Sequence, residues 1–278
     1  MDSKLKKAVL EVHRTAEVLG IKSVLIGALI SELSPEVGAD YPAFRRTNDA
    51  DFALPVPDWE SFRKIRSALT AKDFKQHPKI ERRLLRGEVM VDLIPYGEKV
   101  APAGRLRWPD SEFEMNVIGF KEVCEAASAK VRKGAPVVPI ISVPGFVLLK
   151  IVAFLDRRER QDARYRNDAV DALYWFEHYA SGAEDPRRFD AAARIGGEPI
   201  DYAAAGAALL GLEVGQLASK VAGEAVVGFL EESQDPYSPF MDAAAGRGLD
   251  EDADKKKRAA TLELLKAFAR GYERARTA

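Results

Sequence analysis

The sequence predicts an α+β protein in which a small β-sheet with helices precedes an all-helical C-terminal region. Three observations lead to this prediction. Short apolar segments typical of strands, SVLIG, DADFAL and EVMVDLIP, all lie within the first hundred residues. The segment before the first of them and the segment between the second and the third carry apolar residues at helical spacing. After Asp185 the composition turns to Ala, Leu, Gly and Glu, with helical periodicity and few residues that favour strands.

The first elements follow from local patterns. Apolar residues at helical spacing between positions 5 and 19 predict a helix that Gly20 ends. SVLIG then predicts a short strand that ends at Gly27. Residues 34–43 are polar and contain Pro and Gly, which indicates a loop.

The next elements bring the chain to its third strand. Residues 49–54 (DADFAL) predict the second strand. Asp58 is placed to cap a helix whose apolar residues share one side. A basic segment, residues 75–86, leads into EVMVDLIP, the third strand. The strands therefore come early and are separated by helices or loops.

The second part of the chain is predicted to be helical. Pro144 opens a strongly apolar helix, and a further helix covers about residues 165–178. Residues 233–254 contain two X-Pro steps and an acidic run, which predicts a loop. We therefore expect two domains, residues 1–142 and residues 143–278.

Composition excludes several classes of protein. A content of 47% hydrophobic and 31% charged residues is typical of a globular protein with a real core. The single cysteine, Cys124, rules out an internal disulfide and sits in a predicted amphipathic helix, which favours a buried structural thiol. His13, His77 and His178 lie far apart without the spacing of zinc ligands. The chain has no run of 18 apolar residues and no N-terminal signal pattern, so we expect a cytoplasmic protein without a membrane span.

Three carboxylates carry the first indication of function. Side chains alternate between the two faces of a strand, so Asp49 and Asp51 project from the same face. Asp92 lies on what we expect to be a neighbouring strand. Clustered carboxylates repel one another unless a cation lies between them, and Mg²⁺ prefers oxygen ligands. The three acids therefore suit two Mg²⁺ ions that assist an in-line displacement at phosphorus, although a D-x-D pair is also common as solvated acids at a strand end.

A glycine upstream strengthens the functional interpretation. Gly27 and Ala28 follow the first strand and precede the acidic pair. Backbone N–H groups of such a turn can approach a triphosphate because no side chain stands in the way. We therefore expect Gly27 and Ala28 to bind nucleotide.

These motifs resemble a known family. Gly27-Ala28 followed by Arg46-Thr47-Asn48-Asp49-Ala50-Asp51-Phe52 is similar to the polymerase-β-type nucleotidyltransferase signature, and more narrowly to the AbiEii/AbiGii toxin-family nucleotidyltransferases. The similarity extends over about residues 20–180 through PVPDWESF, VDLIPYG, RWPD, VIGFKE and VPGFVLLKIVAFLDR. The resemblance implies a small mixed sheet followed by a helical domain, and transfer of a nucleoside monophosphate from an NTP with release of pyrophosphate. It also implies that Arg46 and Thr47 contribute to nucleotide binding.

The resemblance assigns two residues of the second part to the site. Lys150 matches the lysine of the family's K-x-x-A element, where pairing with the NTP triphosphate is its natural role, although a lysine in an apolar helix can also snorkel to the surface. Asp168 matches the family's functional acid in RNDAVDAL, and Asp171 lies one turn further on. Ala28 stands where the family often has Ser or a second Gly, and Asn167 stands where it usually has Lys.

The sequence leaves three hypotheses for the acceptor of the transferred group. The toxin resemblance favours RNA, in particular the 3′ end of tRNA, and it implies a cognate antitoxin as a partner. Arginines at positions 82, 83, 86, 105 and 107 could contact a phosphate backbone and Trp108 could stack on a base, although such arginines are also common as solvated charges. A second hypothesis is transfer to a protein or a small molecule. A third is a degenerate protein that binds nucleotide or a partner without turnover.

Overall fold

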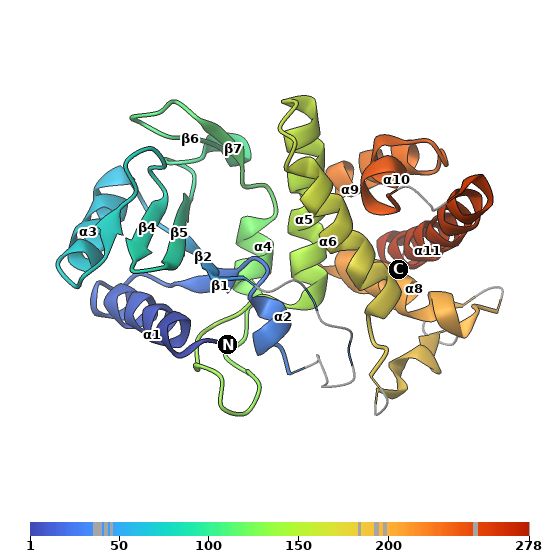
Figure 1. The fold of residues 1–278 in the computed structure, drawn as a ribbon, viewed down its shortest axis with the longest axis horizontal. Coiled ribbons are helices and arrows are strands. Elements are labelled where there is room, and N and C mark those ends of the chain that lie inside the picture. The colour runs from blue at the N-terminus through green and yellow to red at the C-terminus, as the bar shows by residue number, and fades with distance from the viewer. Residues whose placement is uncertain are drawn as a thin grey trace. The chain divides into compact units, whose positions relative to one another are not determined.

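The computed structural model of the 278-residue chain divides into two compact units. It describes residues 1–35, 41, 44, 47–182, 185–191, 195–196, 199–246 and 250–277. The first unit extends to Ser142, and the second begins at Val143 and also takes in Tyr41. Figure 1 shows the strands in the first unit and helices throughout the second. The fold is therefore α+β, with a mixed sheet followed by a helical region.

The first unit combines helices and short strands in alternation. Its elements are α1 (Ser3–Val18), β1 (Val24–Ile26), α2 (Ile30–Leu33), β2 (Asp49–Pro55), α3 (Trp59–Thr70), β3 (Lys75–Gln76), β4 (Arg83–Arg86), β5 (Val89–Tyr96), the 3₁₀ turn η1 (Pro102–Gly104), β6 (Arg105–Arg107), β7 (Glu114–Asn116) and α4 (Phe120–Glu125). Strands β1 to β5 form one sheet in the order β1-β2-β5-β4-β3, and β6 and β7 form a separate antiparallel pair.

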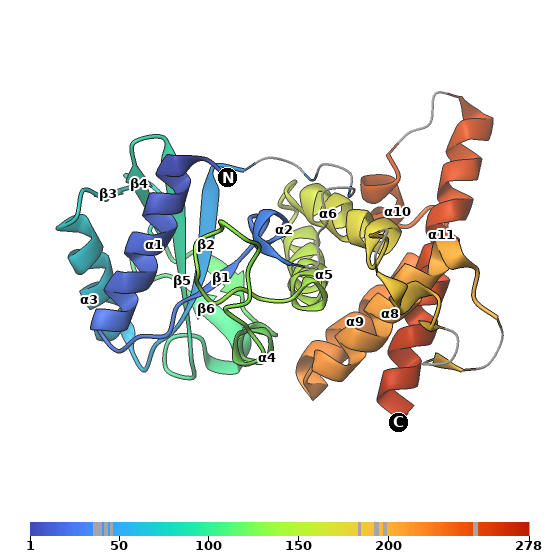
Figure 2. The same cartoon turned by 90° about the horizontal axis from the view of Figure 1, so that it is seen from below.

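The five-stranded sheet is mixed, as the resemblance implied. The two central strands, β2 and β5, run parallel, and every other neighbouring pair is antiparallel. A parallel pair needs a crossover connection, and α3 lies in that connection between β2 and β5. Figure 2 shows α1 and α3 together on one face of this sheet and α4 on the other. The central position of β2 and β5 fixes where their side chains meet.

Helix signals in the sequence predicted the helices of this unit well. Asp2 and Asp58 cap α1 and α3, since their side chains accept hydrogen bonds from backbone N–H groups of the first turn. Val9 and Val12 of α1 are fully buried, as are Ile65 of α3 and Phe52 and Leu93 of the sheet. The apolar stripe of each helix therefore packs into one core with the strands.

Two segments differ from the sequence predictions. Residues 75–86 were described only as a basic segment that leads into the third strand, whereas they contain β3 and β4. Their alternation is weak because arginines flank Leu84 and Leu85, so the period of a strand is hard to detect. Residues 233–254 were expected to be a loop, but α10 (Pro239–Ala244) lies inside the segment. Ser238 caps α10 and Pro239 occupies its first turn, so these residues begin a helix.

The second unit is helical wherever the structure describes regular secondary structure. Its elements are α5 (Val143–Glu159), α6 (Tyr165–His178), the 3₁₀ turn η2 (Pro186–Arg188), α8 (Tyr202–Leu217), α9 (Lys220–Ser233), α10 and α11 (Glu251–Thr277). Aromatic rings from different helices meet in its core. Phe154 and Phe229 lie with their ring centroids 5.9 Å apart, Phe240 contacts both, and Phe176 and Phe268 are 4.8 Å apart. This aromatic cluster holds α5, α6, α9, α10 and α11 together.

Helices α8 and α11 approach each other closely because glycines face the contact. A Cβ on Gly211 of α8 would lie 2.0 Å from the carbonyl oxygen of Phe268. A Cβ on Gly271 of α11 would lie 1.8 Å from the carbonyl oxygen of Ala208. Any larger residue at either position would force the two backbones apart.

Within the described residues, none of the helices combines the length and the apolar character that crossing a bilayer requires.

Candidate functional site

The register of the two central strands brings the predicted acids together. Asp51 of β2 is the direct partner of Asp92 on β5, and Asp49 pairs with Met90 two positions earlier. Partners in register point to the same face of a sheet, as do residues two apart on one strand. The prediction that Asp49, Asp51 and Asp92 lie on adjacent strands is therefore confirmed. Ala50 and Phe52, which alternate with the acids, are fully buried.

Gly27 is packed directly against one of these acids. It follows β1, whose last residue, Ile26, pairs with Asp51. A Cβ on Gly27 would lie 2.1 Å from Oδ2 of Asp51, and the residue has a φ of 78°. Only glycine satisfies both conditions, because other residues rarely adopt positive φ and their Cβ would collide with the carboxylate. The backbone turn that the sequence predicted as a phosphate contact thus lies beside the acids.

Replacement of Gly27 should therefore damage the site. In Gly27→Ala the new methyl group must displace the Asp51 carboxylate, so we expect a large loss of Mn²⁺ affinity. Gly20→Ala is the matched control, since Gly20 also has positive φ (67°) but nothing lies within 4 Å of its Cβ position. It should cost about 1–2 kcal/mol of stability and leave the site intact. Measuring Mn²⁺ binding by both variants separates the effect of backbone strain, which both share, from the effect of the collision with Asp51, which only Gly27→Ala has. Equal Mn²⁺ affinities of the two variants would contradict the expected role of Gly27.

Asp92 is held by two arginines. Arg82 Nε donates to Oδ2 of Asp92 at 2.9 Å, and Arg83 donates from Nε to Oδ1 at 2.7 Å and from Nη2 to Oδ2 at 3.1 Å. The pKa of the Arg83 guanidinium is raised, first by its hydrogen bond to Asp92 and further by the charges of Asp49 and Asp51. Sequence reasoning missed this pair because it did not recognise β4, which places Arg83 opposite Asp92.

The donor set suits a divalent cation at two of the three acids. Asp49 and Asp51 supply carboxylate oxygens from one face of β2 beside a turn without a side chain, which is the oxygen-rich environment that Mg²⁺ prefers. Over the described residues, however, no three His, Cys, Asp or Glu side chains are grouped so as to hold a metal ion. Both oxygens of Asp92 accept hydrogen bonds from the arginines. Asp92, the third predicted ligand, thus lies near Asp49 and Asp51 but is paired with Arg82 and Arg83.

The structure places two of the other residues that were predicted to bind nucleotide, Thr47 and Ala28, close to the acids in sequence or in the fold. The Thr47 hydroxyl accepts a hydrogen bond from the backbone N–H of Asp49 at 3.0 Å, so Thr47 shapes the start of β2. Ala28 is buried, and its carbonyl oxygen accepts a hydrogen bond from the Ser31 hydroxyl at 2.8 Å. Arg46 lies outside the described residues. Nucleotide binding by these residues stays a prediction.

Lys150 belongs to a buried ionic cluster of the second unit. Its ammonium lies 2.9 Å from Asp168 Oδ1 and 2.8 Å from Asp171 Oδ2. Arg157, two turns further along α5, contacts the other oxygen of Asp168 at 2.5 Å. Both aspartates are fully buried at the start of α6, and the Phe146 ring lies 5.3 Å from the ammonium. The snorkelling interpretation of Lys150 is therefore wrong.

The cluster raises the pKa of Lys150 above its ordinary value of 10.5. Burial by itself lowers this pKa, but the charges and hydrogen bonds of Asp168 and Asp171 outweigh it. Lys150 is therefore charged at neutral pH and already has two carboxylate partners. Sequence analysis assigned Lys150 and Asp168 to the functional site; the structure shows that they form one ion cluster with Asp171 and Arg157, and their role in a reaction stays a prediction.

The proposed stacking role of Trp108 is wrong. Its side chain is 2% exposed and packs in the core of the first unit, with its ring centroid 5.8 Å from that of Trp59 and 5.6 Å from that of Phe62. A base cannot reach it. Arg82 and Arg83, which were considered as contacts to a phosphate backbone, are paired with Asp92 instead.

Cys124 is a buried thiol, as expected. It lies on α4, and burial raises its pKa to about 12. A thiol that stays protonated at neutral pH is a poor nucleophile. Cys124 therefore contributes to packing.

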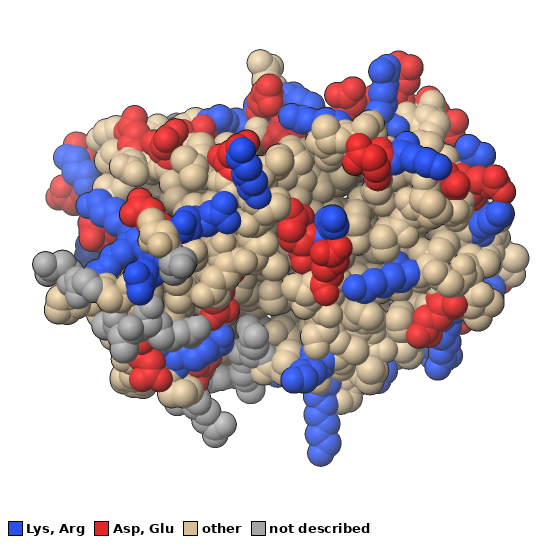
Figure 3. All heavy atoms as spheres, turned by 180° about the vertical axis from the view of Figure 1, so that it is seen from behind, with Lys and Arg blue, Asp and Glu red and all other residues tan. Residues whose placement is uncertain are grey.

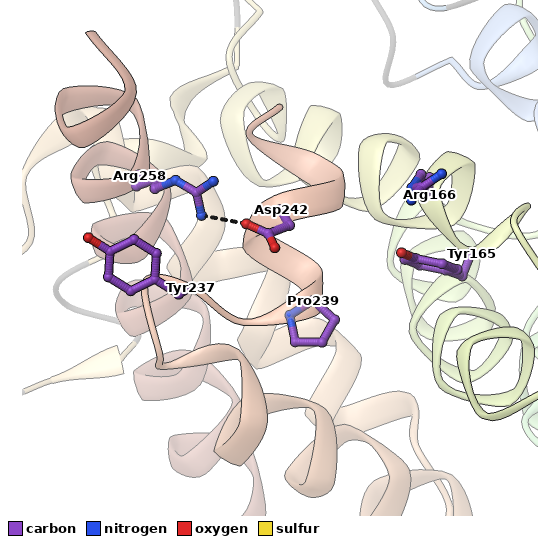
Figure 4. Close-up of a pocket in the computed structure, with 6 residues that line it drawn as sticks. All are labelled: Tyr165, Arg166, Tyr237, Pro239, Asp242 and Arg258. Carbon is purple, nitrogen blue, oxygen red and sulfur yellow. Dashed lines mark ion pairs between the residues drawn. The ribbon is translucent and has the colours of Figure 1, made fainter. Parts of the chain in front are cut away.

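A pocket of about 520 Å³ opens within the second unit (Figure 4). Tyr165, Arg166, Tyr237, Pro239, Asp242 and Arg258 line it. Arg258 forms ion pairs with Asp242 and Asp254, each at 2.8 Å, and its guanidinium lies 5.5 Å from the centre of the Tyr237 ring. The guanidinium of Arg166 lies 5.4 Å from the centre of the Tyr165 ring. The volume of the pocket is within the range of sites for small molecules. The lining of the pocket combines aromatic rings with guanidinium groups.

The charged side chains visible in Figure 3 are intermixed, with lysines and arginines lying beside aspartates and glutamates over the face shown. Such a surface does not attract a polyanion over its whole extent. Any contact with nucleic acid on that face must therefore rely on a local site.

Comparison with known proteins gives limited matches. No protein-family model matches the sequence, and no curated protein matches it significantly. Among solved structures, the chain is similar to ANT(2″)-Ia in complex with adenylyl-2″-tobramycin, at 11% identity and a TM-score of 0.38 over 59% of this chain and 87% of that one. It is also similar to the solution structure of the antibiotic-resistance factor ANT(2″)-Ia, at 14% identity and a TM-score of 0.41 over 70% and 93% of the two chains. Similarity at these TM-scores is too slight to support an inference about this chain.

Proposed function

We propose that this protein is a Mg²⁺-dependent nucleotidyltransferase. The observation that supports the proposal most is the register of β2 and β5, which places Asp51 beside Asp92, with Asp49 two residues away and Gly27 against Asp51. The arrangement agrees with the signature that the sequence shares with polymerase-β-type nucleotidyltransferases. Clustered acids beside a backbone turn suit the binding of a cation and a triphosphate.

The chemistry is the one that the family resemblance implies. A hydroxyl group of the acceptor attacks the α-phosphorus of an NTP and releases its proton to the solvent. The new P–O bond forms as the bond between the α-phosphorus and the oxygen bridging to the β-phosphate breaks, and pyrophosphate leaves. Asp49 and Asp51 would hold Mg²⁺, which neutralises phosphate charge and orients the reacting oxygens when bound. Gly27 has no side chain that would stand between its backbone and phosphate oxygens. Lys150 and Asp168 act in the same reaction by the family resemblance.

The acceptor we propose is RNA, in particular the 3′ end of tRNA, as in the AbiEii/AbiGii toxins that the sequence resembles. A toxin of this kind would pair with a cognate antitoxin. Support for an RNA acceptor comes from the pocket lined by Tyr165, Arg166 and Tyr237, because aromatic rings and arginines are the side chains on which single-stranded nucleic acid stacks. The buried Trp108 and the paired Arg82 and Arg83 give the RNA acceptor no support.

The direct experiment is to incubate the protein with each α-labelled NTP, Mg²⁺, total RNA and cell lysate. We expect label in RNA, and less of it for Tyr237→Ala, with the exposed Tyr202→Ala as a control because Tyr202 lies outside the pocket. Label in protein or in a small molecule would overturn the RNA acceptor but keep nucleotidyl transfer. No label with any NTP would contradict the proposed function itself.

A further inference from the structure

We infer that the pocket of the second unit holds one nucleotide of a single RNA strand, and that Asp242 selects a base with an exocyclic amino group, such as cytosine, over uracil. The inference rests on the RNA acceptor proposed above and deepens it by naming the kind of base that the pocket takes. Three side chains of the lining carry it: an exposed aromatic ring, an exposed arginine and an exposed carboxylate.

Tyr237 supplies the ring on which a base stacks. This residue is 71% exposed although it lines the pocket. The guanidinium of Arg258 lies 5.5 Å from the centre of the Tyr237 ring. Arg258 is itself held in place, because it pairs with Asp242 and Asp254 and donates to the carbonyl oxygen of Pro236 at 2.8 Å. Tyr237 therefore has a fixed cation beside it and a surface open to a ligand, which is the combination on which bases of single strands stack.

Arg166 supplies the cation for a phosphate group. It lies on α6 and is exposed. In the part of the chain that the structure describes, the recorded partner of its guanidinium is the Tyr165 ring, 5.4 Å from the ring centre, and not a carboxylate. Arg164, two residues earlier, pairs with Asp162 instead. Arg166 thus keeps its charge available at the pocket, and a phosphate is the anion that every nucleotide of an RNA strand brings.

Asp242 supplies an acceptor for the edge of the base. Its ion pair with Arg258 uses Oδ1, at 2.8 Å, and its side chain is 62% exposed. Because Arg258 is fixed by further contacts, the pair orients the carboxylate and leaves Oδ2 facing a ligand. A carboxylate oxygen accepts a hydrogen bond from the amino group of cytosine. Uracil presents a carbonyl oxygen at the same position, and two acceptors repel each other.

The size and layout of the pocket fit such a ligand. Its volume of about 520 Å³ is within the range of sites for small molecules. Figure 4 shows Tyr165 and Arg166 on one side of the group and Tyr237 with Arg258 on the other. Single-stranded RNA is read in this way by stacking on aromatic rings and by hydrogen bonds to the edges of splayed bases.

The test compares two RNA probes that differ at the base edge. Fluorescein-labelled oligocytidylate and oligouridylate of equal length are titrated with the protein, and the binding is followed by fluorescence anisotropy. Cytosine and uracil have nearly the same shape, so a difference in affinity reports the edge and not the fit. We expect the wild-type protein to bind oligocytidylate about tenfold more tightly, the effect of one hydrogen bond to a charged group.

Asp242→Asn should bring the ratio of the two affinities close to one, because it removes the carboxylate. Asp254→Asn is the matched control. Asp254 pairs with the same arginine at the same distance of 2.8 Å but does not line the pocket. If Asp242 served only to hold Arg258, both variants would change the ratio alike. Circular dichroism verifies that each variant is folded, which the exposure of the Asp242 side chain favours.

The other two side chains should change the affinity for both probes and leave their ratio unchanged. Tyr237→Ala should weaken binding by about tenfold, whereas Tyr237→Phe should retain it because the stacking ring remains. Arg166→Gln should weaken binding and lower its dependence on salt concentration, since one phosphate contact is lost. Arg164→Gln is the control for this substitution, because Arg164 lies outside the pocket lining.

The possible contrary results separate the parts of the inference. Equal affinities for the two probes, or a preference for cytosine that persists in Asp242→Asn, would overturn the selection of the base. Absence of binding to both probes, or binding that Tyr237→Ala does not weaken, would overturn the nucleotide site in this pocket. Nucleotidyl transfer is decided separately by the labelled NTPs, so it can stand when the inference fails.

Discussion

Replacement of Lys150 by methionine is expected to lower the free energy of unfolding by about 3–5 kcal/mol, the usual cost of removing one partner from a buried ion pair. The substitution keeps the apolar stem but takes the ammonium away from Asp168 and Asp171, which are both fully buried. Asp168 keeps its contact with Arg157, so the loss should be smaller than for a carboxylate that loses every partner. Equilibrium unfolding in urea measures the loss.

Lys255→Met is the matched control for this substitution. Lys255 also forms an ion pair with a carboxylate, Glu251, but both side chains are well exposed. Its removal should change the stability by no more than about 0.5 kcal/mol. Combining Lys150→Met with Asp171→Asn should restore part of the loss, because the second substitution removes the carboxylate charge. An unchanged or higher melting temperature for Lys150→Met would instead support a lysine that snorkels to the surface.

The same ion cluster predicts a dependence on pH. The pKa of Lys150 is raised in the folded protein above its ordinary value of 10.5. A raised lysine pKa stabilises the fold fully below the unfolded value, and this contribution disappears as the pH rises through the folded value. The difference in stability between the wild-type protein and Lys150→Met should therefore be constant near neutral pH and shrink above about pH 10.5. A difference that grows in alkali would contradict the assignment.

Substitution of Asp51 by asparagine is expected to abolish nucleotidyl transfer while the protein stays folded. Loss of a metal-ligating carboxylate removes several kcal/mol of transition-state stabilisation, which corresponds to about three powers of ten in rate. The fold should tolerate the change because asparagine has nearly the same shape and fits against Gly27.

Transfer of label from an NTP and thermal unfolding are measured together on this variant. Asp49→Asn should behave in the same way, since Asp49 and Asp51 share one face of β2. Asp110→Asn serves as the control, because Asp110 is an exposed acid outside the sheet, and it should leave transfer unchanged. Transfer near the wild-type rate in Asp51→Asn would place the chemistry elsewhere. An unfolded variant would give Asp51 a structural role.

The sequence predicted the parts of the fold that have strong local signals. Helices α1, α3, α5 and α6 follow from apolar spacing, and the N-caps of α1 and α3 are aspartates. The acidic pair on β2 and the acid on β5 follow from strand alternation, because the face of a side chain depends only on its position in the strand. Helical spacing, N-capping and strand alternation depend on neighbouring residues in the sequence and not on tertiary contacts.

Tertiary packing decided what the sequence did not predict. Strand β4 consists of two leucines between two arginines, and it is a strand because β5 lies beside it. The pairing of Arg83 with Asp92 depends on that strand, so it could not be predicted without the sheet. Trp108 was considered for stacking on a base because it follows Arg105 and Arg107, whereas its ring lies in the aromatic core with Trp59 and Phe62. Sequence neighbours say little about which side of a short strand faces the core.

The most direct test of the central proposal, that Asp49 and Asp51 hold the cation of a nucleotidyl transfer site, is the anomalous diffraction of crystals grown with Mn²⁺ and a non-hydrolysable NTP analogue. The account predicts a Mn²⁺ peak within coordination distance, about 2.0–2.3 Å, of carboxylate oxygens of Asp49 and Asp51, with the triphosphate on the same ion. A bound triphosphate whose Mn²⁺ contacts neither Asp49 nor Asp51 would contradict it.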